Sequence, residues 1–127
     1  MLIDGGPAGR WAAGAFEGHD LLAPHLAVFE AANILRRHEV AGVISADQAA
    51  QAHADLLDLP IDLWPYGPLA WRTWELRRNL SAYDAAYVAL AEITGATLAT
   101  LDRRIGRAPG LRCAIANFEP DEPSSEI

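Results

Sequence analysis

The stretch of residues 81–104, SAYDAAYVALAEITGATLATLDRR, restricts the possible folds more than any other part of the chain. Ser81, followed three residues later by Asp84, is typical of a helix start, because the hydroxyl accepts from the backbone of the first turn and the acid suits the helix dipole. Gly95 is typical of a helix end, since glycine adopts the left-handed conformation without strain. The spacing between them predicts a helix with an apolar face formed by Tyr83, Tyr87, Leu90 and Ala91.

A short strand and a second acid follow this helix. Residues 96–101 form an apolar run typical of a buried strand, and Asp102 comes directly after it. In an open parallel sheet, a helix starts at the edge where the strands end, and the next strand returns to that edge. We therefore expect Asp84 and Asp102 to lie at one edge of the sheet. Two carboxylates held there repel each other unless a proton or a cation intervenes, and Mg²⁺ prefers such oxygen ligands.

Each of these acids also has a purely structural explanation. Asp84 could stabilise only its own helix start, an effect of about 0.3–1 kcal/mol. Asp102 could be the N-cap of a short helix through Ile105 and Arg107. For either acid taken alone, the structural explanation is at least as good as metal binding.

A third acid joins them by the same argument. Residues 21–23 read as a short strand, and Pro24 precedes a longer helix in which Glu30 falls in the early turns. The start of a helix that follows a strand lies at the same sheet edge as Asp84 and Asp102. The alternative is that Glu30 is a half-exposed surface residue.

The remaining elements alternate in the same way, and the chain fits an α/β fold. The helix that Pro68 opens carries Trp71 and Trp74, which we expect in the core rather than as a platform for stacking bases. The other predicted elements are a helix from Pro7 to Phe16, a helix from the Ser45–Gln48 capping box to about Leu57, an edge strand within 59–65, a short Arg-rich helix after Asp102 and a last strand over 111–116.

Length and charge limit the function classes. At 127 residues the chain is expected to be one domain, residues 1–118, followed by an acidic tail, residues 119–127, expected to be disordered. Ten arginines against seventeen acids give a net charge of −7, so the chain does not bind nucleic acid non-specifically. Any chemistry on nucleic acid must rest on local arginines and on metal ions that offset the carboxylates.

Cellular location follows from what the sequence lacks. No apolar run approaches the roughly 18 residues that a membrane span needs, and the start of the chain has no basic signal-peptide region. Cys113 is the lone cysteine, so the chain has no internal disulfide. This composition agrees with a reducing compartment, and we expect a cytoplasmic protein without a membrane partner.

Four segments, covering almost all of residues 7–116, resemble PIN-domain ribonucleases, specifically the toxins of VapBC-type toxin–antitoxin pairs. They are LLAPHLAVFEAANILRR, LPIDLWP, TWELRRNLSAYDAAYVALAE and GATLATLDRRIGRAPGLRC. The resemblance implies a three-layer α/β sandwich with a mostly parallel central sheet flanked by helices. It also implies that Glu30, Asp84 and Asp102 are catalytic carboxylates around Mg²⁺ or Mn²⁺, the acids that the topology argument places together.

The resemblance assigns supporting roles as well. Ser81 and Thr100 would support the site through their hydroxyls, although Ser81 could simply be a helix cap and Thr100 a strand residue. Arg103 would contact the RNA backbone. The implied reaction is in-line cleavage of RNA by an endoribonuclease, releasing a 3′-hydroxyl and a 5′-phosphate.

The implied partners are an RNA substrate, a cognate antitoxin that offers an Arg or Lys to the carboxylates, and a second copy of the chain in a homodimer. The alternative function is a catalytically impaired PIN-like interaction module that binds antitoxin or RNA without cleaving.

The N-terminus departs from the family pattern. Members begin with an apolar strand ending in an acid and then a helix, whereas here GGPAGRW follows directly after MLID. We expect that this first strand, which lies at the middle of the sheet, is missing from the chain and that Asp4 lies in a loop. The alternative is that MLID is itself a shortened first strand with Asp4 as the fourth acid.

Overall fold

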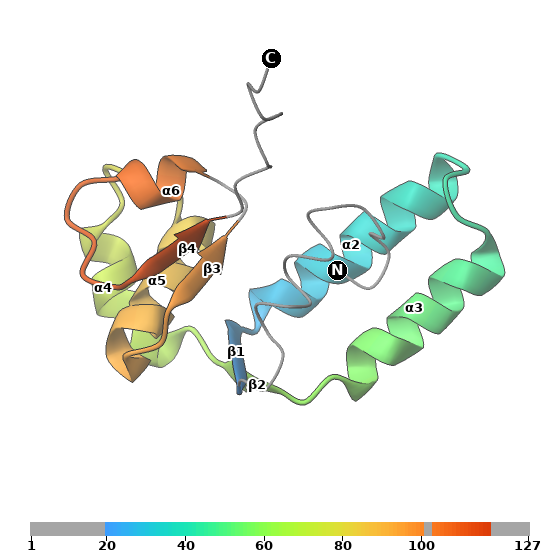
Figure 1. The fold of residues 1–127 in the computed structure, drawn as a ribbon, viewed down its shortest axis with the longest axis horizontal. Helices are drawn as coiled ribbons and strands as arrows, with labels where there is room; N and C mark the ends of the chain where they lie inside the picture. The colour runs from blue at the N-terminus through green and yellow to red at the C-terminus, as the bar shows by residue number, and fades with distance from the viewer. Residues whose placement is uncertain (1–19, 101–102, 118–127) are drawn as a thin grey trace, which may run out of the picture.

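The computed structural model describes residues 20–100 and 103–117 of the chain (Figure 1). Helices alternate with strands, so the α/β class is confirmed. The elements are β1 (Leu21–Pro24), α2 (Leu26–Val40), α3 (Ala46–Asp58), β2 (Ile61–Trp64), the 3₁₀ turn η1 (Gly67–Leu69), α4 (Ala70–Glu75), α5 (Ala82–Thr94), β3 (Leu98–Thr100), α6 (Arg103–Arg107) and β4 (Ile115–Asn117).

The predicted helix boundaries are confirmed by capping bonds. The Ser45 hydroxyl accepts from the Gln48 backbone N–H at 3.0 Å, and the Gln48 side chain accepts from the Ser45 N–H at 2.8 Å, which forms the expected capping box of α3. Helix α5 begins after Ser81 and ends at Gly95, whose φ of 73° is left-handed.

The strands form two separate parallel pairs. β1 pairs with β2, Leu21 opposite Ile61, and β3 pairs with β4, Leu98 opposite Ile115. Within the described residues β2 has β1 as its only strand neighbour, as expected of an edge strand. The parallel arrangement expected from the family resemblance is present, but as two halves rather than one continuous sheet.

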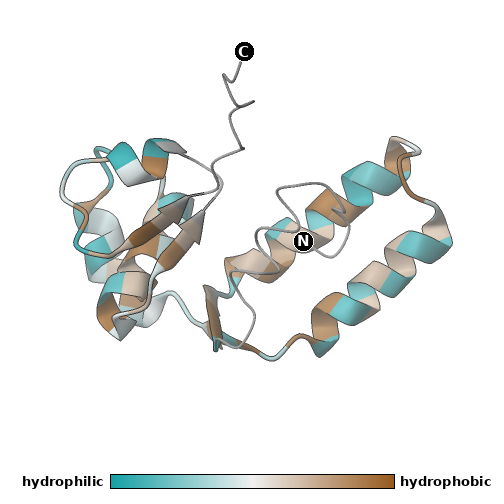
Figure 2. Ribbon diagram, viewed as in Figure 1, coloured by the Kyte–Doolittle hydropathy of each residue, from teal (hydrophilic) through white to brown (hydrophobic). Residues whose placement is uncertain are grey.

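Helix α5 joins the two halves. One side of it buries Ala85, Val88 and Ala91 with the β3–β4 half, and the other side buries Ala86, Ala89 and Leu90 with residues near β1 and β2. Figure 2 shows the mainly apolar strands beside it. Because both strand pairs pack against α5, this helix fixes the position of one pair relative to the other.

An apolar cleft of about 690 Å³ separates the two halves. Leu22 of β1 and Leu98 of β3 line its two sides, and Leu90 and Ala91 of α5 also line it. Neither β1 nor β3 has a second strand neighbour among the described residues. The cleft therefore lies where a central strand would connect the two pairs.

The last strand is shorter than predicted, Ile115–Asn117 rather than 111–116. The backbone N–H of Arg112 donates to the Glu92 carboxylate at 2.7 Å instead of to a strand. Glu92 also receives two bonds from the Arg72 guanidinium, at 2.6 and 3.2 Å. This network holds α4, α5 and the segment before β4 together, so the strand pairing begins only at Ala114, whose carbonyl accepts from the Leu98 N–H at 2.9 Å.

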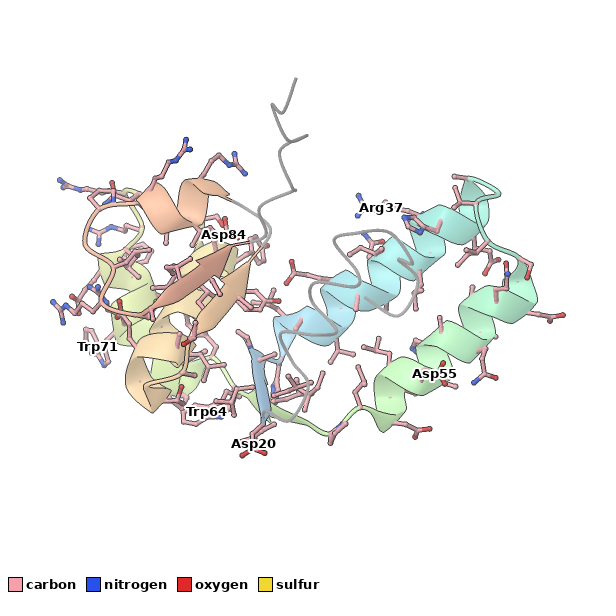
Figure 3. All side chains as sticks on the ribbon, in the orientation of Figure 1. Asp20, Arg37, Asp55, Trp64, Trp71 and Asp84 are labelled. Carbon is pink, nitrogen blue, oxygen red and sulfur yellow. The ribbon has the colours of Figure 1, made fainter. Side chains whose placement is uncertain are left out.

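The prediction that Trp71 and Trp74 belong to the core is wrong. They are 84% and 62% exposed, and Figure 3 shows Trp71 on the outer surface. Helix α4 turns Thr73 inward instead, and Leu76, just after it, is also buried. The Arg77 guanidinium lies 4.7 Å from the centre of the Trp74 ring, so this face is an exposed cation–π surface.

The predicted helix from Pro7 to Phe16, Asp4, and the tail 119–127 lie outside the described residues. Within residues 20–100 and 103–117, no helix has the length and apolar character required to cross a membrane.

Candidate functional site

Two of the three predicted acids lie near the starts of helices, α2 directly after β1 and α5 after α4. Glu30 lies one turn into α2, directly after β1. Asp84 lies in the first turn of α5 and is labelled in Figure 3. Helix α2 exposes Glu30, whereas Asp84 is half-buried. This is the placement that the topology argument predicts for both residues.

Tyr87 connects these two acids. Its hydroxyl donates to Oε1 of Glu30 at 2.7 Å, which joins α5 to α2. Tyr87 also lies three residues after Asp84, so the two side chains are neighbours on one face of α5. Burial raises the pKa of the Tyr87 phenol, and the hydrogen bond and charge of Glu30 and the charge of Asp84 raise it further. The phenol therefore stays protonated and remains a donor to Glu30.

The carboxylate of Asp84 is not used by the helix cap. The cap bond runs from the Asp84 backbone N–H to the Ser81 hydroxyl at 3.1 Å. In α3, by contrast, the Gln48 side chain accepts the reciprocal bond from the N-cap residue. Asp84 makes no such bond to Ser81, and its carboxylate accepts no hydrogen bond from the described residues. The capping explanation for Ser81 holds, while the Asp84 carboxylate is available to a ligand.

The third predicted acid, Asp102, lies outside the described residues. In the chain it stands between Thr100, the last residue of β3, and Arg103, the first residue of α6. The backbone of Thr100, predicted to support the site, is thus at the carboxyl end of a strand, and that of Arg103, predicted to contact RNA, is at the start of a helix. Their predicted side-chain roles remain predictions.

The donor chemistry of the described site fits a hard divalent cation. Mg²⁺ is commonly held by one or two carboxylates together with water, and Glu30 and Asp84 supply two. No group of three or more His, Cys, Asp or Glu side chains that could hold a metal occurs within residues 20–100 and 103–117. A third protein ligand would have to come from outside these ranges, where Asp102 lies.

Tyr87 is the functional residue that sequence reasoning missed. Its spacing from Leu90 and Ala91 suggested an apolar core position, and its ring is indeed half-buried. Its position three residues after Asp84 is the signal that could have placed its hydroxyl beside the acids. Tyr83, assigned to the same apolar face, is instead 68% exposed.

Comparison with known proteins identifies the family of this chain. A profile of the family described as PIN domain matches residues 1–111. Ribonuclease VapC1 of Mycobacterium tuberculosis is 45% identical over 95 residues, which cover 73% of this chain and 71% of that protein. Ribonuclease VapC12 of the same organism is 34% identical over 109 residues, covering 86% and 84%.

A more distant organism has a similar protein. Ribonuclease VapC3 of Pyrobaculum aerophilum is 34% identical over 93 residues, covering 70% of this chain and 71% of that protein. The family profile spans most of the chain, and each of these three relatives matches at least 70% of it. The chain therefore belongs to the PIN-domain family, among its VapC-type ribonucleases.

Proposed function

We propose that this chain is a metal-dependent endoribonuclease toxin that cleaves phosphodiester bonds in RNA. The observation that supports the proposal is the position of Tyr87, whose hydroxyl donates to Glu30 at 2.7 Å and whose phenol pKa is also raised by the charge of Asp84. Its relatives' names, ribonucleases of the VapC type, support RNA as the substrate.

In this proposal Glu30 and Asp84, together with Asp102, hold Mg²⁺ or Mn²⁺. When bound, the cation supplies a nucleophile from water at neutral pH and offsets the charge that grows on the phosphate. Tyr87 fixes the Glu30 carboxylate in one orientation through its hydrogen bond. Ser81 fixes the first turn of α5 and with it the backbone that presents Asp84. Attack in line with the leaving oxygen releases a 3′-hydroxyl and a 5′-phosphate.

Arginines near the site would position the RNA backbone, because the chain has a net charge of −7 and cannot attract RNA as a whole. Helix α6 carries Arg103, Arg104 and Arg107 just after the position of Asp102. We assign backbone contact to Arg103 and support of the site to Thr100.

We further propose that a cognate antitoxin controls the activity in the cytoplasm and that the toxin is a homodimer. Exposed carboxylates around a metal site are a fitting target for an antitoxin Arg or Lys. Co-purification from the native host with a small partner, and a dimer mass by light scattering, are the expected results. A monomer at all concentrations with no such partner would contradict this part.

The second candidate is a PIN-like module that binds antitoxin or RNA without cleaving. The acids of the described residues favour it, because no group of three or more His, Cys, Asp or Glu side chains that could hold a metal occurs within residues 20–100 and 103–117. With three carboxylates the affinity for divalent metal should be lower, since affinity for hard cations rises with ligand charge. In that case Mn²⁺ restores activity where Mg²⁺ does not.

Substitution of Asp84 by Asn separates these candidates. We expect Asp84→Asn and Glu30→Gln to abolish Mn²⁺-dependent cleavage of an RNA oligonucleotide, with an unchanged unfolding midpoint, because the amides keep the shape but lose the charge. The double variant should lose no more than each single variant, since the ligands act as a unit.

The matched control is Asp58→Asn, which removes an exposed acid at the end of α3. It should cleave at the wild-type rate. Cleavage by Asp84→Asn at that same rate would rule out the assignment, and a wild-type protein that binds RNA but never cleaves it would favour the binding module.

A further inference from the structure

A second, smaller cavity of about 220 Å³ lies where the ends of β1 and β2 meet the starts of α2 and α5. Aromatic side chains dominate its lining: Trp64 at the end of β2, Tyr66 just beyond it, and Tyr83 in the first turn of α5. Tyr66 and Tyr83 are 56% and 68% exposed, so their rings are accessible from solvent. Exposed rings around an apolar hollow at the carboxyl ends of strands form a ligand-binding arrangement.

The helices place this pocket next to the carboxylate site. Tyr83 lies one turn before Tyr87 on α5, and Leu26, which also lines the pocket, lies one turn before Glu30 on α2. Residues four apart on a helix are neighbours, about 5–6 Å between Cβ atoms. The pocket therefore continues the surface formed by Glu30 and Tyr87, displaced by a single turn towards the starts of both helices.

The pocket is held open by the backbone of the strand ends. The His25 N–H donates to the Trp64 carbonyl at 2.9 Å, which joins the end of β1 to the end of β2. The Trp64 indole N–H points to Oδ2 of Asp62 at 3.4 Å, a weak bond that biases the ring orientation. Pro24 adds a rigid wall. The shape is thus set before a ligand arrives.

We propose that this pocket takes one unstacked nucleobase of the RNA, next to the phosphate that is cleaved, with Tyr83 as the ring on which the base stacks. The inference rests on the proposed ribonuclease function and names its specificity-determining site. Single-stranded RNA is read by stacking its bases on aromatic side chains, whereas a carboxylate–metal site contacts only the phosphate. An apolar pocket without described acids in its lining suits a base better than a phosphate or a basic peptide.

The test compares Tyr83→Ala, Tyr83→Phe and the control Trp71→Ala, which removes an exposed aromatic from α4 outside the pocket. Cleavage is measured on an RNA oligonucleotide and on a set in which one nucleotide at a time lacks its base. We expect Tyr83→Ala to raise KM about tenfold with little change in kcat, Tyr83→Phe to retain wild-type KM, and Trp71→Ala to have no effect.

The position of the missing base gives the sharper result. For the wild type, removing the base at one position adjacent to the cut should raise KM about tenfold, as Tyr83→Ala does. For Tyr83→Ala, removing that base should leave KM unchanged, because the base has already lost its stacking partner. Equal effects at every position would overturn the proposal. So would a change of oligomeric state in Tyr83→Ala without a base-dependent effect, since the pocket would then hold a second copy of the chain.

Failure of the ribonuclease function is distinguishable from failure of the pocket. If the wild type cleaves no RNA, binding of the same oligonucleotides in EDTA is followed through fluorescence of Trp64, with Trp64→Phe to identify its signal. The pocket is supported in a protein that does not cleave if quenching of Trp64 fluorescence requires one particular base and is lost in Tyr83→Ala. Binding that is independent of every base and of Tyr83 overturns it.

Discussion

Tyr87 is bonded to Glu30, and its phenol pKa is raised by the charges of both described acids. The sequence predicts Glu30 and Asp84 because acids at the starts of helices in a parallel α/β fold approach one sheet edge. Both residues lie near helix starts, and their role as metal ligands stays a prediction. The sequence does not predict the hydrogen bond between Tyr87 and Glu30, because that contact depends on the packing of α2 against α5. The third acid, Asp102, stays a prediction, since it lies outside the described residues.

Replacement of Tyr87 by Phe tests the role of this contact. We expect Mn²⁺ affinity and cleavage to fall about tenfold, as is typical when a partner that orients a metal ligand is removed. The free energy of unfolding should fall by only about 1 kcal/mol, since the ring remains packed. Titration calorimetry and urea unfolding provide the two readouts.

Tyr83→Phe is the matched control for metal binding, because Tyr83 lies one turn away and its hydroxyl makes no described hydrogen bond. It should bind Mn²⁺ as the wild type does. Wild-type affinity in Tyr87→Phe as well would show that Glu30 needs no orientation by this phenol.

At the scale of the elements, helix starts and ends are predicted best. Ser45, Ser81 and Gly95 occupy the positions expected from their local chemistry, because caps depend only on neighbouring residues. The side of α4 that faces inward was predicted wrongly, since the spacing of Trp71 and Trp74 shows that they share a face but not which face is buried. The late start of the strand pairing at β4 depends on Glu92, 20 residues from Arg112, and no local pattern reveals it.

Glu92 provides a test of how the elements are held together. Burial raises its pKa, but the hydrogen bond from Arg72, the N–H of Arg112 and the charges of both arginines outweigh burial and hold the pKa below its usual value. A carboxylate with a lowered folded-state pKa stabilises the protein above its unfolded pKa, and this contribution is lost as pH falls through the folded pKa. Glu92→Gln should therefore lose about 1–3 kcal/mol of unfolding free energy at pH 7.

The difference between wild type and Glu92→Gln should shrink as pH falls below about 4.5, the usual value of this group. Urea unfolding at pH 7 and pH 3 measures it. Glu75→Gln is the control, because Glu75 is 60% exposed and bonds Arg72 only at 3.4 Å, so it should change stability by less than about 1 kcal/mol. A Glu92→Gln penalty that is constant with pH would contradict the assigned cause.

At the scale of the molecule, the family resemblance predicted the parallel strands and the α/β class, and both are confirmed. It also led us to expect an absent central strand, and the described residues leave an apolar cleft of about 690 Å³ between β1 and β3. Strand order depends on contacts between distant segments, so spacing within the sequence could not predict the division into two pairs.

We expect one further parallel strand to fit this cleft. A test protein carries, ahead of Met1, an apolar strand ending in Asp and a helical crossover of a dozen or more residues, the minimum for a parallel connection. Its unfolding temperature should rise by several degrees, and Mn²⁺ should bind more tightly because the added Asp joins the site.

The control extension has Ser and Gly in place of the apolar strand residues. It should melt at the temperature of the unextended chain. If the two extended proteins unfold at the same temperature, the cleft does not accept a strand.

The central claim is that Glu30 and Asp84 hold a divalent cation, and calorimetric titration of Mn²⁺ tests it most directly because Mn²⁺ binds mixed sites more tightly than Mg²⁺. The wild type should bind Mn²⁺ saturably, Asp84→Asn should show at least tenfold weaker binding with unchanged unfolding, and Asp4→Asn should bind as the wild type does if Asp4 lies in a loop. Identical isotherms for the wild type and Asp84→Asn would contradict the account.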